Sequence, residues 1–270
     1  MGSRTLAQIR EHYEIEKELA NRLRNSLREE RRSLYGAVYD ELFQRVPLHP
    51  QLTQKRSAQD KLKEAIHQLS FLRPFLGKEV IFLEIGPGDC ALSFAVAKRV
   101  RKVYGADVSA EITKNLECPQ NFELILSDGS SIPLPANSVD VAYSNQLMEH
   151  LHPEDAVEQL THIYRVLVKQ GKYVCVTPNR LSGPHDVSGY FDEMATGFHL
   201  KEYTHRDLSD LFKKVGFSEI RAYVGATEVY VRCPLSVLCL LEGVLECLPH
   251  RVGKRIARLC LVNIRLVGIK

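Results

Sequence analysis

The sequence lacks any uninterrupted apolar run of the roughly 18 to 20 residues that a membrane-spanning helix needs. It also lacks internal repeats and low-complexity tracts, which argues against a repeat protein or a disordered chain. The net charge at pH 7 is only +3, so general nucleic-acid binding is not expected. Seven cysteines without regular spacing predict no disulfide framework. Because Arg4, Arg10 and Glu11 stand where a secretory signal has its apolar core, we expect a cytoplasmic location.

The composition that remains is typical of a globular protein: 44% of the 270 residues are apolar and 26% are charged. The charge is unevenly distributed. Residues 1–76 carry 14 Lys and Arg against 10 Asp and Glu, residues 77–228 carry 15 against 21, and residues 229–270 carry 7 against 2. An acidic middle between basic flanks suggests a central site for a cationic ligand and flanks that meet an anionic substrate or a membrane. Solvated faces without a partner are the alternative.

Residues 1–76 read as a helical cap. Leu19, Leu23 and Leu27 recur every four residues, and Leu34 to Leu42 repeats the spacing, as on the apolar face of a helix. A further helix is expected from about Ser57 to Leu72.

From residue 77 onward, short apolar strands alternate with helical segments, which favours an α/β fold with a parallel sheet covered on both faces. Ligands bind such sheets at the carboxyl ends of the strands. The expected strands are Val80–Leu83, Val103–Ala106, Phe122–Leu126, Val139–Ser144, Tyr173–Thr177, Glu219–Val224 and Leu261–Val267.

The first strand ends in a glycine turn. Gly86 and Gly88 allow a ligand to approach the backbone, and the following helix start offers free N–H groups. The pattern also fits the dinucleotide fingerprint. Glu84 and Asp89 would repel a diphosphate and attract a ligand that carries an ammonium and a sulfonium, so a nicotinamide cofactor is the second choice.

The next two strands also end in acidic residues. Asp107 lies about 20 residues beyond the glycine turn, as does the ribose-binding carboxylate of dinucleotide sites. Asp128 can accept a hydrogen bond from an exocyclic amine, and Gly129 lets an adenine ring lie close. A single Asp at a strand end is more often a turn former, but three successive strands with such endings indicate a ligand site.

These segments, together with 138–151, resemble the class I S-adenosylmethionine-dependent methyltransferases, and within them the small-molecule group that includes the ubiquinone-biosynthesis enzymes. The resemblance covers about residues 77–228 and a last strand near 261–267. It implies a Rossmann-like, doubly wound, seven-stranded and mostly parallel sheet with an antiparallel last strand, formed by residues 77–270. The implied cofactor is S-adenosyl-L-methionine.

By position, the resemblance places Gly86 and Gly88 at the methionine part of the cofactor and Glu84 near its amino group. It places Asp107 at the ribose and Asp128 with Gly129 at the adenine. Asn145 and Gln146 would lie beneath the methionine moiety. The sequence departs from the family at Cys90, where a third glycine is common, and this puts local helix packing in doubt.

Methyl transfer mainly requires alignment of donor and acceptor, and an oxygen acceptor also benefits from a base. His150 follows the fourth strand and is the candidate catalytic base; a structural role for it and Glu149 is the alternative. His150 and His152 lack a third ligand at recognisable spacing, and the chain has no C-x-x-C motif, so no metal is expected.

The region after the fifth strand supplies the candidate substrate-binding residues, each of which has a structural role as its alternative. They are His185, Tyr190, His199 and Tyr203.

The segment 229–260 is expected to be a helical insertion before the last strand. It is apolar from Pro234 to Leu248 and basic from Arg251 to Arg258. A buried helix pair, a substrate wall, a homodimer surface and a peripheral membrane contact are all compatible with it.

The favoured function is a methyltransferase that acts on a small-molecule methyl acceptor, on oxygen, with no nucleic-acid partner. A non-catalytic cofactor-binding interaction module is the alternative, and an NAD-dependent oxidoreductase is third.

Overall fold

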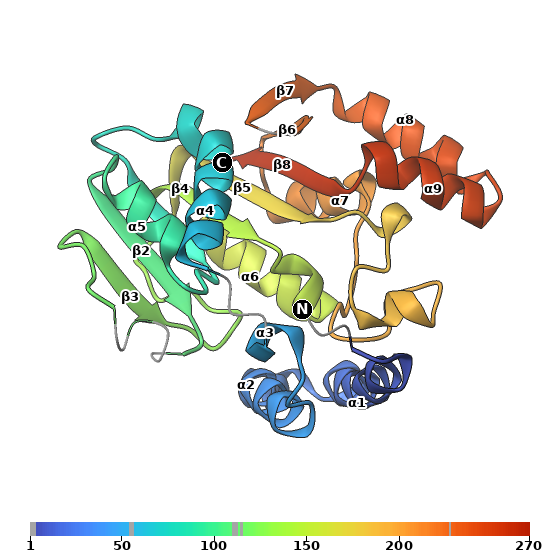
Figure 1. The fold of residues 1–270 in the computed structure, drawn as a ribbon. Helices are drawn as coiled ribbons and strands as arrows, with labels where there is room; N and C mark the ends of the chain where they lie inside the picture. Colours follow the sequence, from blue (N-terminus) through green and yellow to red (C-terminus); the bar gives the residue numbers. More distant parts are fainter. Residues whose placement is uncertain (1–3, 54–56, 110–112, 114–115, 227) are drawn as a thin grey trace.

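The computed structural model describes residues 4–53, 57–109, 113, 116–226 and 228–270, and its centre is one eight-stranded sheet (Figure 1). The strand order is β3-β2-β1-β4-β5-β8-β6-β7. Strands β1 to β5 are parallel to one another, whereas β8 runs antiparallel between β5 and β6. The bounds are β1 Ile81–Ile85, β2 Lys102–Asp107, β3 Phe122–Leu126, β4 Val139–Asn145, β5 Leu167–Pro178, β6 Glu219–Ala226, β7 Val229–Cys233 and β8 Asn263–Ile269.

Alternating apolar residues of the strands form two cores, one on each face of the sheet. In β1, Phe82 packs toward α4 and α5, whereas Leu83 packs in the core that holds α6, α7 and the cap. Both side chains are fully buried, as expected for a strand covered on both faces. The helices are α1 Leu6–Asn25, α2 Arg28–Arg45, α3 Pro50–Thr53, α4 Ala58–Leu72, α5 Ala91–Ala97, α6 Pro153–Val166, α7 His205–Val215, α8 Leu235–Glu246 and α9 His250–Cys260.

The seven strands predicted from the sequence are all present, and an eighth, β7, was not predicted. It forms an antiparallel hairpin with β6 at the edge of the sheet. The segment 229–260 was predicted to be helical throughout, which is wrong for its first five residues. These residues form an edge strand that is largely open to solvent: Val229 and Val231 are exposed, whereas Tyr230 packs against Phe71 of α4.

The two long N-terminal helices lie together on one side of the molecule, below the sheet in the view of Figure 1. The cap predicted for residues 1–76 divides in the structure, because α4 packs with α5 on the other face of the sheet; from here on the cap means α1, α2 and α3. Leu19, Leu23, Val38 and Leu42 are buried in its contact with the central core, as their spacing predicts. Leu27 was expected on the same apolar face but is 72% exposed, because helix α1 ends at Asn25 and Leu27 lies at the break before α2.

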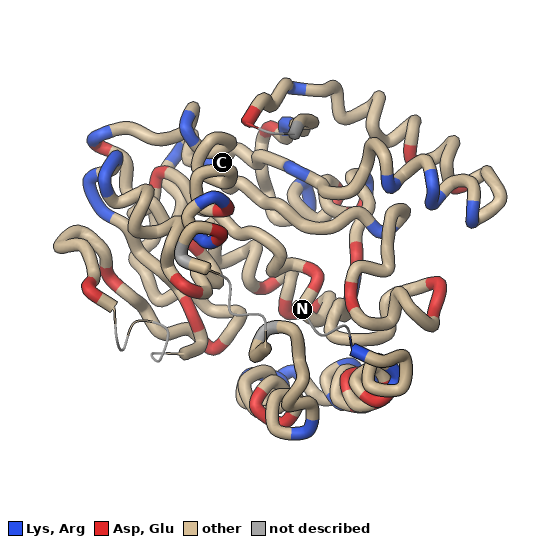
Figure 2. The backbone as a smooth tube through the Cα atoms, viewed as in Figure 1, with Lys and Arg blue, Asp and Glu red and all other residues tan. Residues whose placement is uncertain are grey.

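The α8–α9 pair packs through one face and exposes the other. Leu238, Leu245 and Ala257 are buried, whereas Leu240 and Leu259 are exposed. Figure 2 shows Lys and Arg along α9, where Arg251, Lys254, Arg255 and Arg258 lie, and no acidic residue on that helix. The expectation of a buried helix pair therefore holds only for one face of α8 and α9. Among the described helices, none combines the length and apolarity needed to cross a membrane.

A buried ion pair joins the cap to the sheet domain. Arg31 of α2 is 2% exposed, and its guanidinium donates to both carboxylate oxygens of Asp155 at the start of α6, at 2.8 and 3.1 Å. It also donates to the Ser26 carbonyl at 2.7 Å, and Tyr35 donates to Asp155 at 2.7 Å. Arg31 also pairs with the exposed Glu154, so Asp155 is the group that depends on this contact: without Arg31 its buried carboxylate would keep only the Tyr35 hydroxyl as a side-chain donor.

We therefore predict that Arg31→Ala lowers the free energy of unfolding by about 3–5 kcal/mol, measured by urea denaturation. Arg45→Ala is the control, because Arg45 forms ion pairs with Glu18 and Glu41 that are exposed to solvent. We expect no measurable loss in the control. Equal losses in the two variants would contradict the importance of burial in this contact.

Candidate active site

The glycine turn after β1 has the backbone conformation that the sequence predicts. Gly86 and Gly88 both have positive φ, at 69° and 54°. A side chain at Gly88 would meet no protein atom within 4 Å, so this position is open to a ligand. Cys90, the departure from the family pattern, takes the left-handed conformation at φ 59° and is the N-cap of α5. Its side chain is fully buried, so the helix still packs.

Glu84 lies at the end of β1 beneath this turn. Its carboxyl is buried, 5% exposed, and accepts a hydrogen bond from Ser93 Oγ at 2.5 Å. Burial raises the pKa of Glu84 to about 8, which the bond from Ser93 only partly opposes. A buried carboxyl of this kind is stabilised in its charged form by a ligand ammonium.

Asp107 and Asp128 lie at the carboxyl ends of β2 and β3. Asp107 is half-buried, and burial raises its pKa. One oxygen of Asp128 accepts from the backbone N–H groups of Ser130 and Ser131, at 3.1 and 2.7 Å, while the other lies 3.5 Å from Arg32 of the cap. Burial raises the pKa of Asp128, but these hydrogen bonds outweigh it and hold the pKa at about 2.

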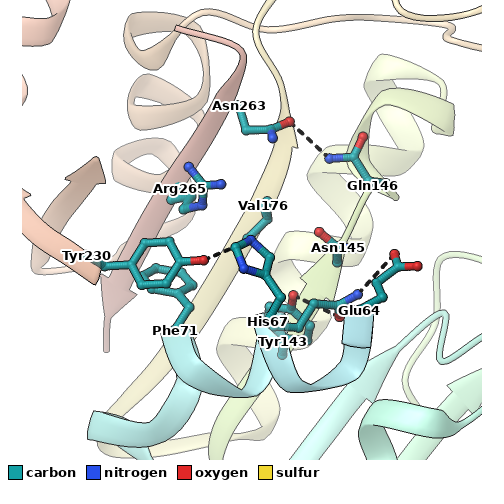
Figure 3. A pocket seen from close by; sticks show the side chains of 11 residues that line it. Glu64, His67, Phe71, Tyr143, Asn145, Gln146, Val176, Tyr230, Asn263 and Arg265 are labelled. Carbon is teal, nitrogen blue, oxygen red and sulfur yellow. Dashed lines mark hydrogen bonds between the residues drawn. The ribbon is translucent and has the colours of Figure 1, made fainter. Parts of the chain in front are cut away.

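Asn145 and Gln146, at the end of β4, line a pocket of about 190 Å³ on the α4 side of the sheet (Figure 3). Gln146 has φ 53° and its side chain donates to Asn263 at 3.3 Å. The pocket does not include Glu84, Gly86 or the two aspartates. Its other lining residues are Glu64, His67, Gln68, Phe71, Tyr143, Val176, Tyr230 and Arg265.

The loop that follows β4 lies directly against the glycine turn. Leu147 Cδ1 is 3.4 Å from the position of a β-carbon at Gly86. Directly after Leu147, the short 3-10 helix Met148–His150 carries Glu149 and His150. The predicted candidate base is therefore on the segment that contacts the cofactor turn.

Glu149, His150 and His199 form a cluster whose ligand atoms all lie within 4.8 Å of one another. Glu149 is fully buried; its Oε2 accepts from Thr177 Oγ1 at 2.8 Å, and its Oε1 has no partner among the described residues. His199 Nδ1 is 2.7 Å from Glu202 Oε1. We call Glu149, His150 and His199 the Glu149 cluster.

Burial changes the pKa values of the cluster in opposite directions. It raises the pKa of Glu149 to about 7 and lowers that of His150 to about 3. Burial also lowers the pKa of His199, but the hydrogen bond to Glu202 and the charge of Glu149 outweigh it, so the pKa is raised. An imidazole with the pKa of His150 is a weak base at neutral pH.

The remaining predicted substrate-binding residues are scattered. His185 Nε2 is 2.9 Å from Ser182 Oγ, and its backbone N–H donates to Glu202 at 2.7 Å, so it supports the same carboxylate as His199. Tyr203 is fully buried, and its hydroxyl has no partner among the described residues. Tyr190 is 64% exposed and is not brought into the Glu149 cluster.

Sequence reasoning missed the supporting residues of this site. Glu202 follows His199 by three residues and could have been found as a local carboxylate–imidazole pair. Arg32 and Tyr39 could not, because their contacts with Asp128 and His150 join residues about a hundred positions apart. Glu149 was considered only as a structural residue.

Comparison with known proteins agrees with this geometry. Residues 83–175 match a family described as "Methyltransferase domain". A curated protein of Mycolicibacterium smegmatis, named "probable S-adenosylmethionine-dependent methyltransferase", is 28% identical over 142 residues, which is 52% of this chain and 52% of that protein. The chain thus matches about half the length of that relative.

Two solved structures have the same fold. A SAM-dependent methyltransferase from Archaeoglobus fulgidus superposes with a TM-score of 0.56 at 17% identity, over 78% of this chain and 94% of that one. An S-adenosylmethionine-dependent methyltransferase from Mesorhizobium loti gives a TM-score of 0.51 at 13% identity, over 74% and 96%.

The raised pKa of Glu84 yields a prediction for stability. The folded chain retains the Glu84 proton up to about pH 8, whereas the unfolded chain loses it near pH 4.5, so ionisation of Glu84 destabilises the fold as pH rises through this range. Glu84→Gln should therefore gain roughly 3–5 kcal/mol of unfolding free energy, relative to the unmodified protein, between pH 5 and pH 8.5. Urea denaturation at both pH values measures this.

The matched control is Glu79→Gln, which changes an exposed glutamate just before β1. Its stability relative to the unmodified protein should not depend on pH. A pH-independent difference for Glu84→Gln as well would mean that Glu84 is not held in its protonated form.

Proposed function

We propose that this protein is a class I S-adenosylmethionine-dependent methyltransferase that transfers the cofactor's methyl group to an oxygen atom of a small or amphiphilic acceptor. The match of residues 83–175 to a methyltransferase domain and the shared fold support the proposal. The observation that carries the proposal is the row of acidic side chains Glu84, Asp107 and Asp128 at the ends of β1, β2 and β3. The closer resemblance to the ubiquinone-biosynthesis group stays a prediction.

The residues at this edge fit S-adenosylmethionine in charge and shape. The buried carboxyl of Glu84 suits the cofactor's ammonium, and the half-buried Asp107 suits the ribose hydroxyls. The open backbone at Gly88 leaves room for the methionine part. The bound cofactor supplies an activated methyl group on a sulfonium, so the chain's own task is to align the acceptor with it.

The acceptor side of the proposed site is the Glu149 cluster. The cluster follows the loop that contacts Gly86. Glu149 and His150 lie on the segment after β4 and His199 lies on the segment before α7, and these two segments meet only in the folded chain. His150 and His199 are proposed to contact the acceptor, with Glu202 as a positioning residue that fixes the His199 ring. The neutral, weakly basic His150 favours contact with an acceptor oxygen over removal of its proton.

The cap is proposed to act as a lid over the cofactor. Arg32 of α2 reaches Asp128, and Tyr35 Cδ2 is 3.6 Å from the position of a β-carbon at Gly129. Asp128 and Gly129 are the residues proposed to hold the adenine. The adenine and the cap would therefore share one binding surface, so cofactor binding should restrain the cap.

The other two functions are disfavoured by the charges of the site. A dinucleotide would place its diphosphate beside Glu84 and Asp89. A non-catalytic interaction module would not require the buried, incompletely bonded carboxylate of Glu149.

We predict that Asp107→Ala weakens S-adenosylmethionine binding at least tenfold, because two hydrogen bonds from the ribose are lost. Isothermal titration calorimetry with S-adenosylmethionine, S-adenosylhomocysteine and NADH measures this. Asp210→Ala, an exposed change on α7, is the control and should bind as the unmodified protein does. Binding of NADH alone would refute the methyltransferase proposal.

We also predict that saturating S-adenosylhomocysteine slows limited proteolysis within residues 4–53 at least severalfold, because a restrained cap opens less often. Quantified gel bands over time give the rates. Asp107→Ala should lose this protection. Equal cleavage of the free and the bound protein would show that the cap is not a lid.

A further inference from the structure

The proton positions in the Glu149 cluster follow from the partners of its two imidazoles. His150 Nδ1 is 3.1 Å from the carbonyl oxygen of Phe198 and 3.1 Å from the Tyr39 hydroxyl. Because a carbonyl can only accept, Nδ1 carries the proton and Nε2 has the lone pair. His199 Nδ1 likewise donates to the carboxylate of Glu202, so Nε2 is the nitrogen that His199 can offer as a ligand; because the pKa of His199 is raised, an ion bound there would displace the Nε2 proton.

The ligand atoms that Glu149, His150 and His199 offer lie within 4.8 Å of one another, and Oε1 of Glu149 is buried without a partner among the described residues. A buried carboxylate oxygen without a partner is costly, and native structures normally satisfy such an atom with a donor or an ion.

We infer that Glu149, His150 and His199 form a binding site for one divalent transition-metal ion, Zn²⁺ by the chemistry of its ligands. Two imidazoles and one carboxylate are a common ligand set for zinc, and they leave a fourth position open. Mg²⁺ and Ca²⁺ prefer six or more oxygen ligands, which this cluster does not offer.

The surroundings of the three ligands are those of a metal site. Each imidazole donates its other N–H to a fixed acceptor, which is Phe198 O for His150 and Glu202 for His199. Thr177 holds the second oxygen of Glu149. The loop carrying His199 is tied to the Glu149 segment by Lys201 N–H, which donates to the Glu149 carbonyl at 3.1 Å.

A second His–Glu–His cluster in the cap provides an internal comparison. His12, Glu16 and His49 are all buried, and their ligand atoms also lie within 4.8 Å of one another. There, however, Arg4 lies 2.8 Å from His12 Nδ1, and a guanidinium can only donate. The proton of His12 is therefore on Nε2, from which it is donated to Glu16 at 2.8 Å. His12 thus has no free lone pair with which to bind a metal.

The sequence did not predict this site because His199 is 49 positions from His150. The expectation of no metal rested on the missing third ligand, which the fold supplies from another segment.

The role of the ion rests on the proposed function, whereas its binding does not. An acceptor hydroxyl bound at the open position becomes more acidic and gives its proton to solvent. The oxygen then attacks the methyl carbon, the carbon–sulfur bond breaks, and the products are the methyl ether and S-adenosylhomocysteine.

Metal analysis of the full-length protein, with any affinity tag removed, tests the inference. After chelation and dialysis, titration with Zn²⁺ should give one bound ion per chain by mass spectrometry of the metal. Titration with Co²⁺ should give the visible absorption of a four- or five-coordinate site. A protein that binds neither ion would overturn the inference.

The variants locate the site. Glu149→Gln and His199→Ala should lose the Co²⁺ absorption, and Glu202→Gln should weaken binding about 10- to 100-fold, as expected for a residue that orients a ligand. His49→Ala, in the cap cluster, should bind as the unmodified protein does. Far-UV circular dichroism checks that each variant is folded. Full binding by the first two variants, or loss in His49→Ala, would place the ion elsewhere.

Titration of the metal-free protein with S-adenosylmethionine separates this inference from the proposed function. Cofactor binding without any metal binding would overturn the metal site and leave the methyltransferase proposal intact. Metal binding without cofactor binding would support the metal site and refute the proposed function.

Discussion

The parallel pairing of β1 with β2 and β4 is the constraint on which the rest of the structure depends. Parallel strands end at the same edge of a sheet, so the glycine turn, Asp107 and the loop after β4 must lie close together. The same pairing requires helices on both faces, which accounts for the two separate apolar cores. The candidate site is a consequence of this topology, because its residues follow different strands.

The second requirement is that charged groups near this edge are buried only where they have partners. Arg31 and Asp155 satisfy each other and join the cap to α6. Glu84 is stabilised by its proton and by Ser93. Glu149 is an exception, since one of its oxygens is buried and has no partner in the part of the chain that the structure describes. Such an exception at the end of β4, beside the proposed cofactor turn, indicates a functional role over a structural one.

The fold could be predicted from local patterns because seven of the eight strands and most helices have their own sequence signals. The position of the candidate cofactor residues at the strand ends could also be predicted, since Gly86, Gly88, Asp107 and Asp128 occur in order along consecutive strands, and their binding of the cofactor stays a prediction. On the acceptor side, His150 and His199 were candidates from the sequence, but their contact with each other could not be predicted. Tyr39, His150 and His199 meet only after the cap and the loop before α7 have folded against the sheet, and single-sequence spacing contains no record of that contact. The edge strand β7 was missed because the apolar helix that follows it dominated the local composition.

The most direct test of the account is a crystal structure of the protein with S-adenosylhomocysteine. The account predicts that the ribose hydroxyls lie within hydrogen-bonding distance of Asp107, that the amino group lies near Glu84, and that the adenine lies beside Gly129 beneath the cap. The sulfur should face the Glu149 cluster. A ligand bound away from the ends of β1 and β2, such as one confined to the pocket beside α4, would contradict it.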